Sequence, residues 1–186
     1  MPNLSTCFRP PTPSIRTKAF SLVELMIALA IIALLSSFAI PAYQDHSIRA
    51  RVASGLVVAL SLKEAVLNNA ANGRPFNEGV SLQPPPNSFI KKLEIAQDTG
   101  TIRVTYLEKL TPTNTPYTLT LVPKYGAIGS EELLAGTATS STIPGGSRIV
   151  WSCRSAEVLQ LYGGWSQLAG TLPAKWAPSS CNQKPW

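Results

Sequence analysis

The most extended feature of the hydrophobic pattern is an uncharged apolar run over residues 25–42, which reads LMIALAIIALLSSFAIPA. At 1.5 Å per residue, a helix of this length spans roughly 27 Å, which is just enough to cross the hydrocarbon core of a bilayer. The pattern therefore predicts a membrane-spanning helix. A secretory signal peptide cut after Ala39 is one alternative, but its apolar region would be too long and Pro41 would follow the cut closely. A buried core helix is the other alternative, and an uncharged run of this length is long for one.

Beyond Pro41 the apolar residues keep a helical spacing, but on one face only. These residues are Ile48, Val52, Leu56, Ala59, Val66 and Ala70. Asn72 and Gly73 are residue types that cap the C-terminal end of a helix. We therefore expect a helix over residues 21–72, roughly 75 Å long. Its first half would be apolar all round, and its second half would be amphipathic against a head domain.

The rest of the chain has the pattern of a small β-rich head. Residues 73–88 are rich in Pro, Asn and Gly and predict a surface loop. Four strands are then predicted, over residues 91–96, 101–107, 117–123 and 148–153. They form an antiparallel meander that the helix covers on one face, which is an α+β fold. Within the interruption at 126–146, residues 130–136 predict a short helix, and an exposed loop rich in Ser, Thr and Gly follows it.

Charge gives the helix an orientation. The formal net charge is +6, but Arg9, Arg16 and Lys18 precede Phe20 in a segment without acids, so removal of that leader leaves +3. Basic residues before the apolar run place the N-terminus in the cytoplasm and the head outside. A charge of +3 is too small to indicate nucleic-acid binding. Nucleic acid is also unsupported as a partner because the head contains seven acids beside basic residues such as Lys91, Lys92, Arg103, Lys109 and Lys124.

Glu24 stands at the head of the apolar run, where an ionised side chain needs a reason. A charge at the bilayer centre costs about 2.5–3.5 kcal/mol, and less near a helix end. One explanation is a capping box with Ser21, in which both side chains satisfy N–H groups of the first turn. The other is a cut between Ala19 and Phe20. The new α-ammonium would lie four residues from Glu24, and it could pair with this carboxylate or with that of a neighbouring subunit.

The cysteines predict one disulfide. Cys7 lies in the leader, which leaves Cys153 and Cys181 in a domain exported to an oxidising compartment. The closed loop of about 29 residues is worth roughly 3.5 kcal/mol in the chain-entropy model. Two unpaired thiols are the alternative. The bridge would hold the C-terminal segment at the sheet edge and so blunt that edge.

Tryptophans near these cysteines have two predicted roles. The loop that the bridge closes is expected to be a surface loop that could contact other subunits, with Trp165, Lys175 and Trp176 on it. Trp151 alternates with Ile149 and Cys153 in the last predicted strand, so we expect it in the core.

The segment KAFSLVELMIALAIIALLSSFAIPAYQDH resembles the N-terminal segment of type IV pilins and related pseudopilins. Those proteins have a short basic leader, a cut before a Phe, a Glu at the fifth mature position, and a long apolar helix with a Pro before AYQD. The C-terminal LPAKWAPSSC resembles, more weakly, the closing disulfide loop of the major type IVa pilins.

The resemblance implies that a prepilin peptidase cuts after Ala19 and that the amine of Phe20 is then N-methylated. It also implies that Glu24 neutralises the Phe20 amine of an adjacent subunit and sets its register. A kink or locally melted turn is implied at Pro41, with Gly55 as a second soft point; the alternative is that Pro41 ends the membrane helix. Two features depart from the family. Ala19 stands where the family usually has Gly, so we expect slower cleavage, and the leader is longer than most.

The expected organisation is a leader at 1–19, a transmembrane or fibre-core helix at 20–42, an amphipathic helix at 43–72 and a globular head at 73–186. The resemblance implies a structural subunit that polymerises through its apolar helix into a type IV pilus, used for adhesion, twitching motility or DNA uptake. The implied partners are further copies of the chain, the prepilin peptidase and N-methyltransferase, and an inner-membrane assembly platform. The subunit would lie in the inner membrane, with its head periplasmic, before it joins a surface pilus.

Other functions stay open at this point. They are a minor or competence-type pilin, a type II secretion pseudopilin, and a single-pass anchored periplasmic protein. The sequence predicts no enzyme, and no catalytic residue, metal site or cofactor. It has one His, and it has neither a Cys/His cluster of metal spacing nor a glycine-rich loop between a strand and a helix.

Overall fold

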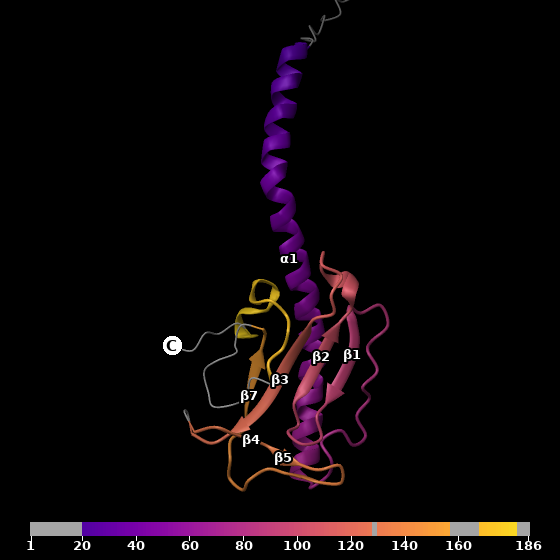
Figure 1. Ribbon diagram of the computed structural model, residues 1–186, viewed down its shortest axis with the longest axis vertical. Coiled ribbons are helices and arrows are strands. Elements are labelled where there is room, and N and C mark those ends of the chain that lie inside the picture. The colour runs from indigo at the N-terminus through magenta and orange to yellow at the C-terminus, as the bar shows by residue number, and fades with distance from the viewer. Residues whose placement is uncertain (1–19, 128–129, 157–167, 182–186) are drawn as a thin grey trace, which may run out of the picture. The chain divides into compact units, whose positions relative to one another are not determined.

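The computed structural model describes residues 20–127, 130–156 and 168–181. The chain divides into two units, Met1–Ile40 and Pro41–Trp186. Helix α1 (Leu22–Ala71) contributes to both units, and the described strands all belong to the second (Figure 1). The predicted α+β class, with a long N-terminal helix and an antiparallel sheet, is confirmed.

The second half of α1 buries one face against the head. Its buried residues recur every three or four positions and are Ile48, Val52, Gly55, Ala59, Leu62, Val66 and Ala70. The helix ends in a Schellman motif, in which Arg74 N–H donates to the Asn69 carbonyl at 2.9 Å and Gly73 N–H to that of Ala70 at 3.3 Å. Gly73 has φ +69°, a conformation that glycine adopts without strain, so the predicted C-cap is confirmed.

The sheet of the head is antiparallel throughout. Strands β1, β2 and β3 follow one another as a meander, and β4 and β7 both pair with the far edge of β3. A second, two-stranded sheet joins β5 to β6. The strand bounds are β1 Ile90–Ile95, β2 Ile102–Tyr106, β3 Thr118–Tyr125, β4 Glu132–Leu133, β5 Ala135–Gly136, β6 Ser141–Thr142 and β7 Val150–Arg154. Each of the four predicted strands overlaps an observed one.

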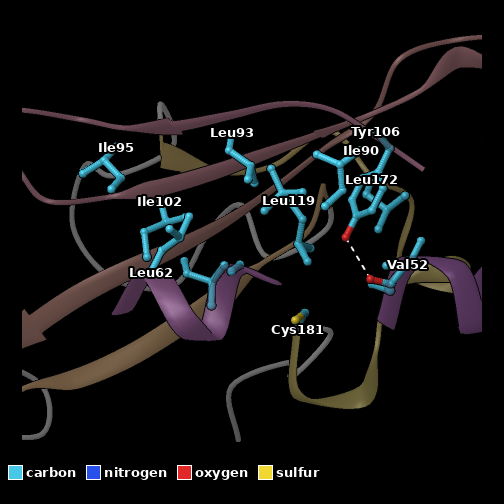
Figure 2. Close-up of a cluster of buried hydrophobic side chains, with 14 of the residues drawn as sticks. Val52, Leu62, Ile90, Leu93, Ile95, Ile102, Tyr106, Leu119, Leu172 and Cys181 are labelled. Carbon is cyan, nitrogen blue, oxygen red and sulfur yellow. Dashed lines mark hydrogen bonds between the residues drawn. The ribbon is translucent and has the colours of Figure 1, made fainter. Parts of the chain in front are cut away.

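The core lies between the sheet and the second half of α1 (Figure 2). Apolar side chains of β1, β2 and β3, including Leu93, Ile102 and Leu119, face Val52 and Leu62 of the helix. Such burial contributes about 1.5–3 kcal/mol for each large aliphatic side chain.

One polar contact crosses this core. The fully buried Tyr106 donates its hydroxyl to the carbonyl of Val52 at 2.9 Å. Gly55 lies directly beneath the ring, since a Cβ placed there would be 2.6 Å from Tyr106 Cε1. Glycine is therefore required here by close packing.

The predicted short helix over residues 130–136 is wrong. These residues instead form β4 and β5, which pair with β3 and β6. Tertiary contacts explain the difference, because Leu134 is buried and Gly136 packs against the ring of Phe76. Gly136 N–H also donates to the carbonyl of Asp98 at 2.9 Å. The loop predicted after this helix is exposed over residues 137–140, but it also contains β6, in which Ser141 is buried.

Candidate assembly surface

The first part of α1 exposes apolar side chains on all sides. Within residues 20–40, the large apolar side chains are 54–82% exposed, and the most apolar window of the helix is 0% buried. Neighbouring residues such as Ile31 and Ile32 point in different directions around a helix, so no polar face exists here. By length and composition this helix can cross a membrane. A contiguous apolar surface of this extent must be covered by lipid or protein.

Glu24 lies in the first turn of α1. That turn closes when Leu25 N–H donates to the Ser21 carbonyl at 3.2 Å, a bond that uses neither side chain of the proposed capping box. A carboxylate here interacts favourably with the helix dipole. Its surroundings are otherwise apolar, so the site favours a positively charged partner.

Ala19, Phe20 and Pro41 are the other residues with predicted roles in processing and assembly. Ala19 lies outside the described residues, and Phe20 is 82% exposed. Pro41 lies inside α1, which is assigned as helix on both sides of it. The cleavage, methylation, register and kink assigned to these residues stay predictions.

The predicted disulfide is present. Cys153 on β7 is bonded to Cys181 on η4 (Ser179–Cys181). The bridge holds the C-terminal segment against the last strand of the sheet. Cys181 is fully buried, so the bond forms part of the core.

Trp176 corrects one expectation about this segment. It lies on η3 (Ala174–Trp176) and is 3% exposed, so it does not belong to a contact surface. Its indole Nε1 donates to Asp45 Oδ1 at 2.8 Å, and its ring meets that of Tyr117 edge-on at 5.7 Å between centroids. Arg49 Nε also donates to the carbonyl of Lys175 at 2.6 Å. The C-terminal segment therefore contacts α1 just after Pro41, through Asp45 and Arg49. Trp165 lies outside the described residues.

Trp151 is half-buried and packs against the core, close to its predicted position. The ammonium of Lys63 lies 5.3 Å from the centroid of its ring. Burial lowers the pKa of Lys63.

An ion pair between a buried lysine and a half-buried glutamate was not predicted. Lys124 of β3 is 7% exposed, and its Nζ lies 3.7 Å from Glu131 Oε2. Burial lowers the pKa of Lys124, and the charge of Glu131 opposes that shift. Arg154 of β7 is also buried, which lowers its pKa. The arrangement fixes the edge where β3, β4 and β7 meet. The pair could not be predicted from the sequence. Glu131 is brought to Lys124 by the pairing of β4 with β3, and β4 is too short to be recognised from its sequence pattern.

The described residues contain no group of three or more His, Cys, Asp or Glu side chains that could hold a metal ion. The single histidine, His46, is exposed. The chemistry that the described residues support is association through an exposed apolar helix.

These features define a class of protein: an α+β head, closed by a disulfide, that carries an apolar helix able to enter a membrane or an assembly. Comparison with known families then makes the assignment. The chain belongs to the pilin family of bacterial filament proteins, whose model matches residues 48–182. The prokaryotic N-terminal methylation motif matches residues 15–40. The pilin family is one of structural subunits.

Individual relatives match over shorter stretches. A fimbrial protein of Moraxella nonliquefaciens is 47% identical over 62 residues, which is 33% of this chain and 40% of the relative. The type IV major fimbrial protein FimA of Dichelobacter nodosus is 45% identical over 62 residues, 33% of this chain and 38% of the relative. The type IV major pilin protein PilE1 of Neisseria gonorrhoeae is 33% identical over 97 residues, 48% of this chain and 58% of the relative. The chain therefore spans between about two fifths and three fifths of these relatives' own length.

Proposed function

We propose that this protein is a structural subunit of a type IV pilus, which polymerises by packing the apolar half of α1 against the same segment of other copies. The observation that carries this proposal is the exposure of apolar side chains all around residues 20–40 of a pilin-family chain. Relatives described as a type IV major fimbrial protein and a type IV major pilin protein support it. Before assembly the same surface is covered by lipid, in a membrane-anchored precursor with a cytoplasmic N-terminus and a periplasmic head.

Glu24 sets the register between subunits in this proposal. A prepilin peptidase removes residues 1–19 and methylates the new amine at Phe20, and methylation keeps its positive charge. Two unit charges 4 Å apart attract by about 4 kcal/mol at an effective dielectric constant of 20. Apolar packing in the fibre core can slide along the helix, whereas a single buried ion pair selects one axial position. Glu24 therefore specifies the stagger, and the apolar contacts supply cohesion.

The remaining parts of the chain take the roles expected of them. Residues 20–42 form the fibre-core helix, 43–72 support the head, and 73–186 form its solvent-facing surface. A kink or local melting at Pro41 lets the two parts of α1 adapt on assembly. An inner-membrane platform extracts the subunits. Adhesion, twitching motility and DNA uptake are the uses that follow from such a filament.

The test separates processing from assembly. The mass and N-terminal sequence of the mature chain should show a start at Phe20 and one added methyl group. Glu24→Ala should be processed but should leave few filaments in sheared surface fractions. Glu64→Ala is the matched control, because it removes an exposed acid from the head half of the same helix. Normal filaments from processed Glu24→Ala would refute the register role. Wild-type chain absent from surface fibres would refute the pilus subunit itself and favour a pseudopilin or an anchored periplasmic protein.

A further inference from the structure

Basic side chains gather at the end of the head where α1 enters it. Arg49 and Arg51 lie on the helix, Lys109 on η1 (Glu108–Leu110) and Lys175 on η3. In Figure 1 the loop after β2 and the yellow C-terminal segment lie at this end, on either side of α1. We call these four residues the basic collar.

Specific contacts position the collar residues. Arg49 Nε donates to the carbonyl of Lys175 at 2.6 Å, which brings these two cations to one side of α1. The guanidinium of Arg51 lies 4.6 Å from the ring centroid of Phe89, whose carbonyl accepts from Leu107 N–H at 2.9 Å, next to η1. Residues two apart on a helix point to nearly opposite sides. The collar therefore surrounds the helix.

The acids at this end are already engaged. Asp45 accepts the indole N–H of Trp176 at 2.8 Å, and Glu108 pairs with Lys91 at 2.5 Å. Arg49, Lys109 and Lys175 are exposed, and Arg51 is half-buried. Cationic groups are thus presented at this end while the nearby carboxylates are held by other partners.

The charge of the chain is concentrated here. The collar with Lys91, Asp45 and Glu108 carries five cations and two carboxylates, a net +3. The other described residues carry seven cations and seven carboxylates and are neutral. Among the described residues, this end of the head therefore carries the whole net charge.

The long side chains of the collar come within reach of the lipid headgroups if residues 25–42 span the membrane. Arg49 is seven residues past Ala42, or roughly 10 Å along the helix axis. The headgroup layer is roughly 5–8 Å thick. Helix side chains lean toward the N-terminus, here toward the membrane, and long basic side chains reach farther still. Tyr43, which is 75% exposed, suits the same interface, where aromatic residues are enriched.

The positions of these cations also run counter to the usual charge bias of membrane helices. Basic residues near a membrane helix favour the cytoplasmic side, yet Arg49 and Arg51 lie within nine residues of the apolar run on the exported side. The cytoplasmic cations Arg9, Arg16 and Lys18 would be lost with the leader. A binding role explains why cations stand at this position against the rule.

We propose that the basic collar binds the phosphate groups of anionic phospholipids in the leaflet that faces the head, while the subunit is stored in the membrane. Guanidinium and ammonium groups match phosphate oxygens in charge and hydrogen bonding. The inference rests on the proposed membrane-anchored state. It adds that extraction into a filament must release these lipids, so anionic lipid content regulates how readily subunits leave the membrane.

The experiment measures lipid selectivity of the full chain reconstituted in phosphatidylcholine vesicles. Electron paramagnetic resonance of spin-labelled phosphatidylglycerol and phosphatidylcholine gives the ratio of their association with the protein. Arg49→Gln with Lys175→Gln should lower the preference for phosphatidylglycerol at least about fivefold, since each surface cation contributes about that factor. Arg49→Lys with Lys175→Arg should keep it. Because the leader is the same in every variant, differences between variants report on the collar.

Arg74→Gln with Arg103→Gln is the matched control, which removes two exposed cations elsewhere on the head and should leave the preference unchanged. An equal loss in this control, or none in the collar variant, would overturn the proposal. If the double variant loses its native near-ultraviolet circular dichroism, Lys175→Gln alone decides, because Lys175 is exposed and its ammonium lies over the Trp176 ring, 4.3 Å from the centroid. A wild-type chain that does not float with vesicles would refute the membrane-anchored state as well.

Discussion

Replacing Gly55 with alanine distinguishes two explanations of this glycine, helix flexibility and close packing. Alanine is favoured over glycine inside a helix by about 1 kcal/mol. If Gly55 were only a soft point, Gly55→Ala would therefore stabilise the protein. The structure predicts the opposite, because the added Cβ would lie 2.6 Å from Cε1 and 2.9 Å from the hydroxyl oxygen of Tyr106.

The magnitude follows from what must move. Tyr106 is 0% exposed and cannot swing into solvent. Overpacking of this kind costs about 1–3 kcal/mol. Displacing the hydroxyl from the Val52 carbonyl removes a hydrogen bond worth about 0.5–1.5 kcal/mol. After subtraction of the gain in helix propensity, Gly55→Ala should lower the free energy of unfolding by about 1–3 kcal/mol. For a domain of this size, that lowers the unfolding temperature by roughly 2–12 °C.

The assay is thermal unfolding of the full chain in detergent micelles, followed by near-ultraviolet circular dichroism. Ala53→Gly is the matched control, because it makes the reverse change at an exposed position two residues away. Propensity alone predicts opposite signs for the two variants, whereas close packing predicts that both destabilise. In a Tyr106→Leu background, Gly55→Ala should become neutral or stabilising. A Gly55→Ala protein that melts higher than wild type would refute the close-packing explanation.

Three further predictions use the same unfolding assay. Trp176→Ala should lower the free energy of unfolding by about 3–5 kcal/mol, because the side chain is buried. Lys175→Ala should change it by less than about 1 kcal/mol. Similar effects of the two substitutions would show that Trp176 is not part of the core. Reduction of the Cys153–Cys181 bridge should lower stability by roughly 3.5 kcal/mol, and an unchanged melt would contradict this. Burial raises the pKa of Tyr106 above its ordinary value of 10.0, so above pH 10 the folded state keeps a proton that the unfolded state loses, and stability should fall with rising pH. Tyr106→Phe should remove that part of the loss, and equal slopes for both proteins would count against it.

Local pattern was enough to predict α1, because the reasons for its formation lie within it. The uncharged run at 25–42 and the spacing from Ile48 to Ala70 both follow from helical geometry. Even Gly55 fits that spacing, with Val52 and Ala59 on either side of it in the buried series. A glycine in the buried register of an amphipathic helix is a signal of close approach. Attention to register would have found it from the sequence.

The head was harder to predict where contacts span long distances along the chain. The sequence alternates clearly in β2 and in the first half of β3, whereas β4, β5 and β6 have two residues each, too few to show a period. Trp176 is expected at the surface because it lies on the loop that the disulfide closes. The partner that buries it, Asp45, lies 131 positions away. Nothing near a tryptophan in the sequence tells whether a distant carboxylate will accept its N–H.

The same distinction separates the two candidate surfaces of this protein. The apolar half of α1 is recognisable from sequence, since each exposed side chain there contributes independently and local composition is the whole signal. The basic collar depends on folding, since Lys109 and Lys175 are brought to Arg49 and Arg51 by β2, η1 and the disulfide-linked segment. A substitution that loosens the C-terminal segment should therefore weaken the collar without touching the apolar helix. Reduction of the disulfide thus becomes a probe of lipid selectivity as well as of stability. It should lower the preference for phosphatidylglycerol while the chain still inserts into the vesicles.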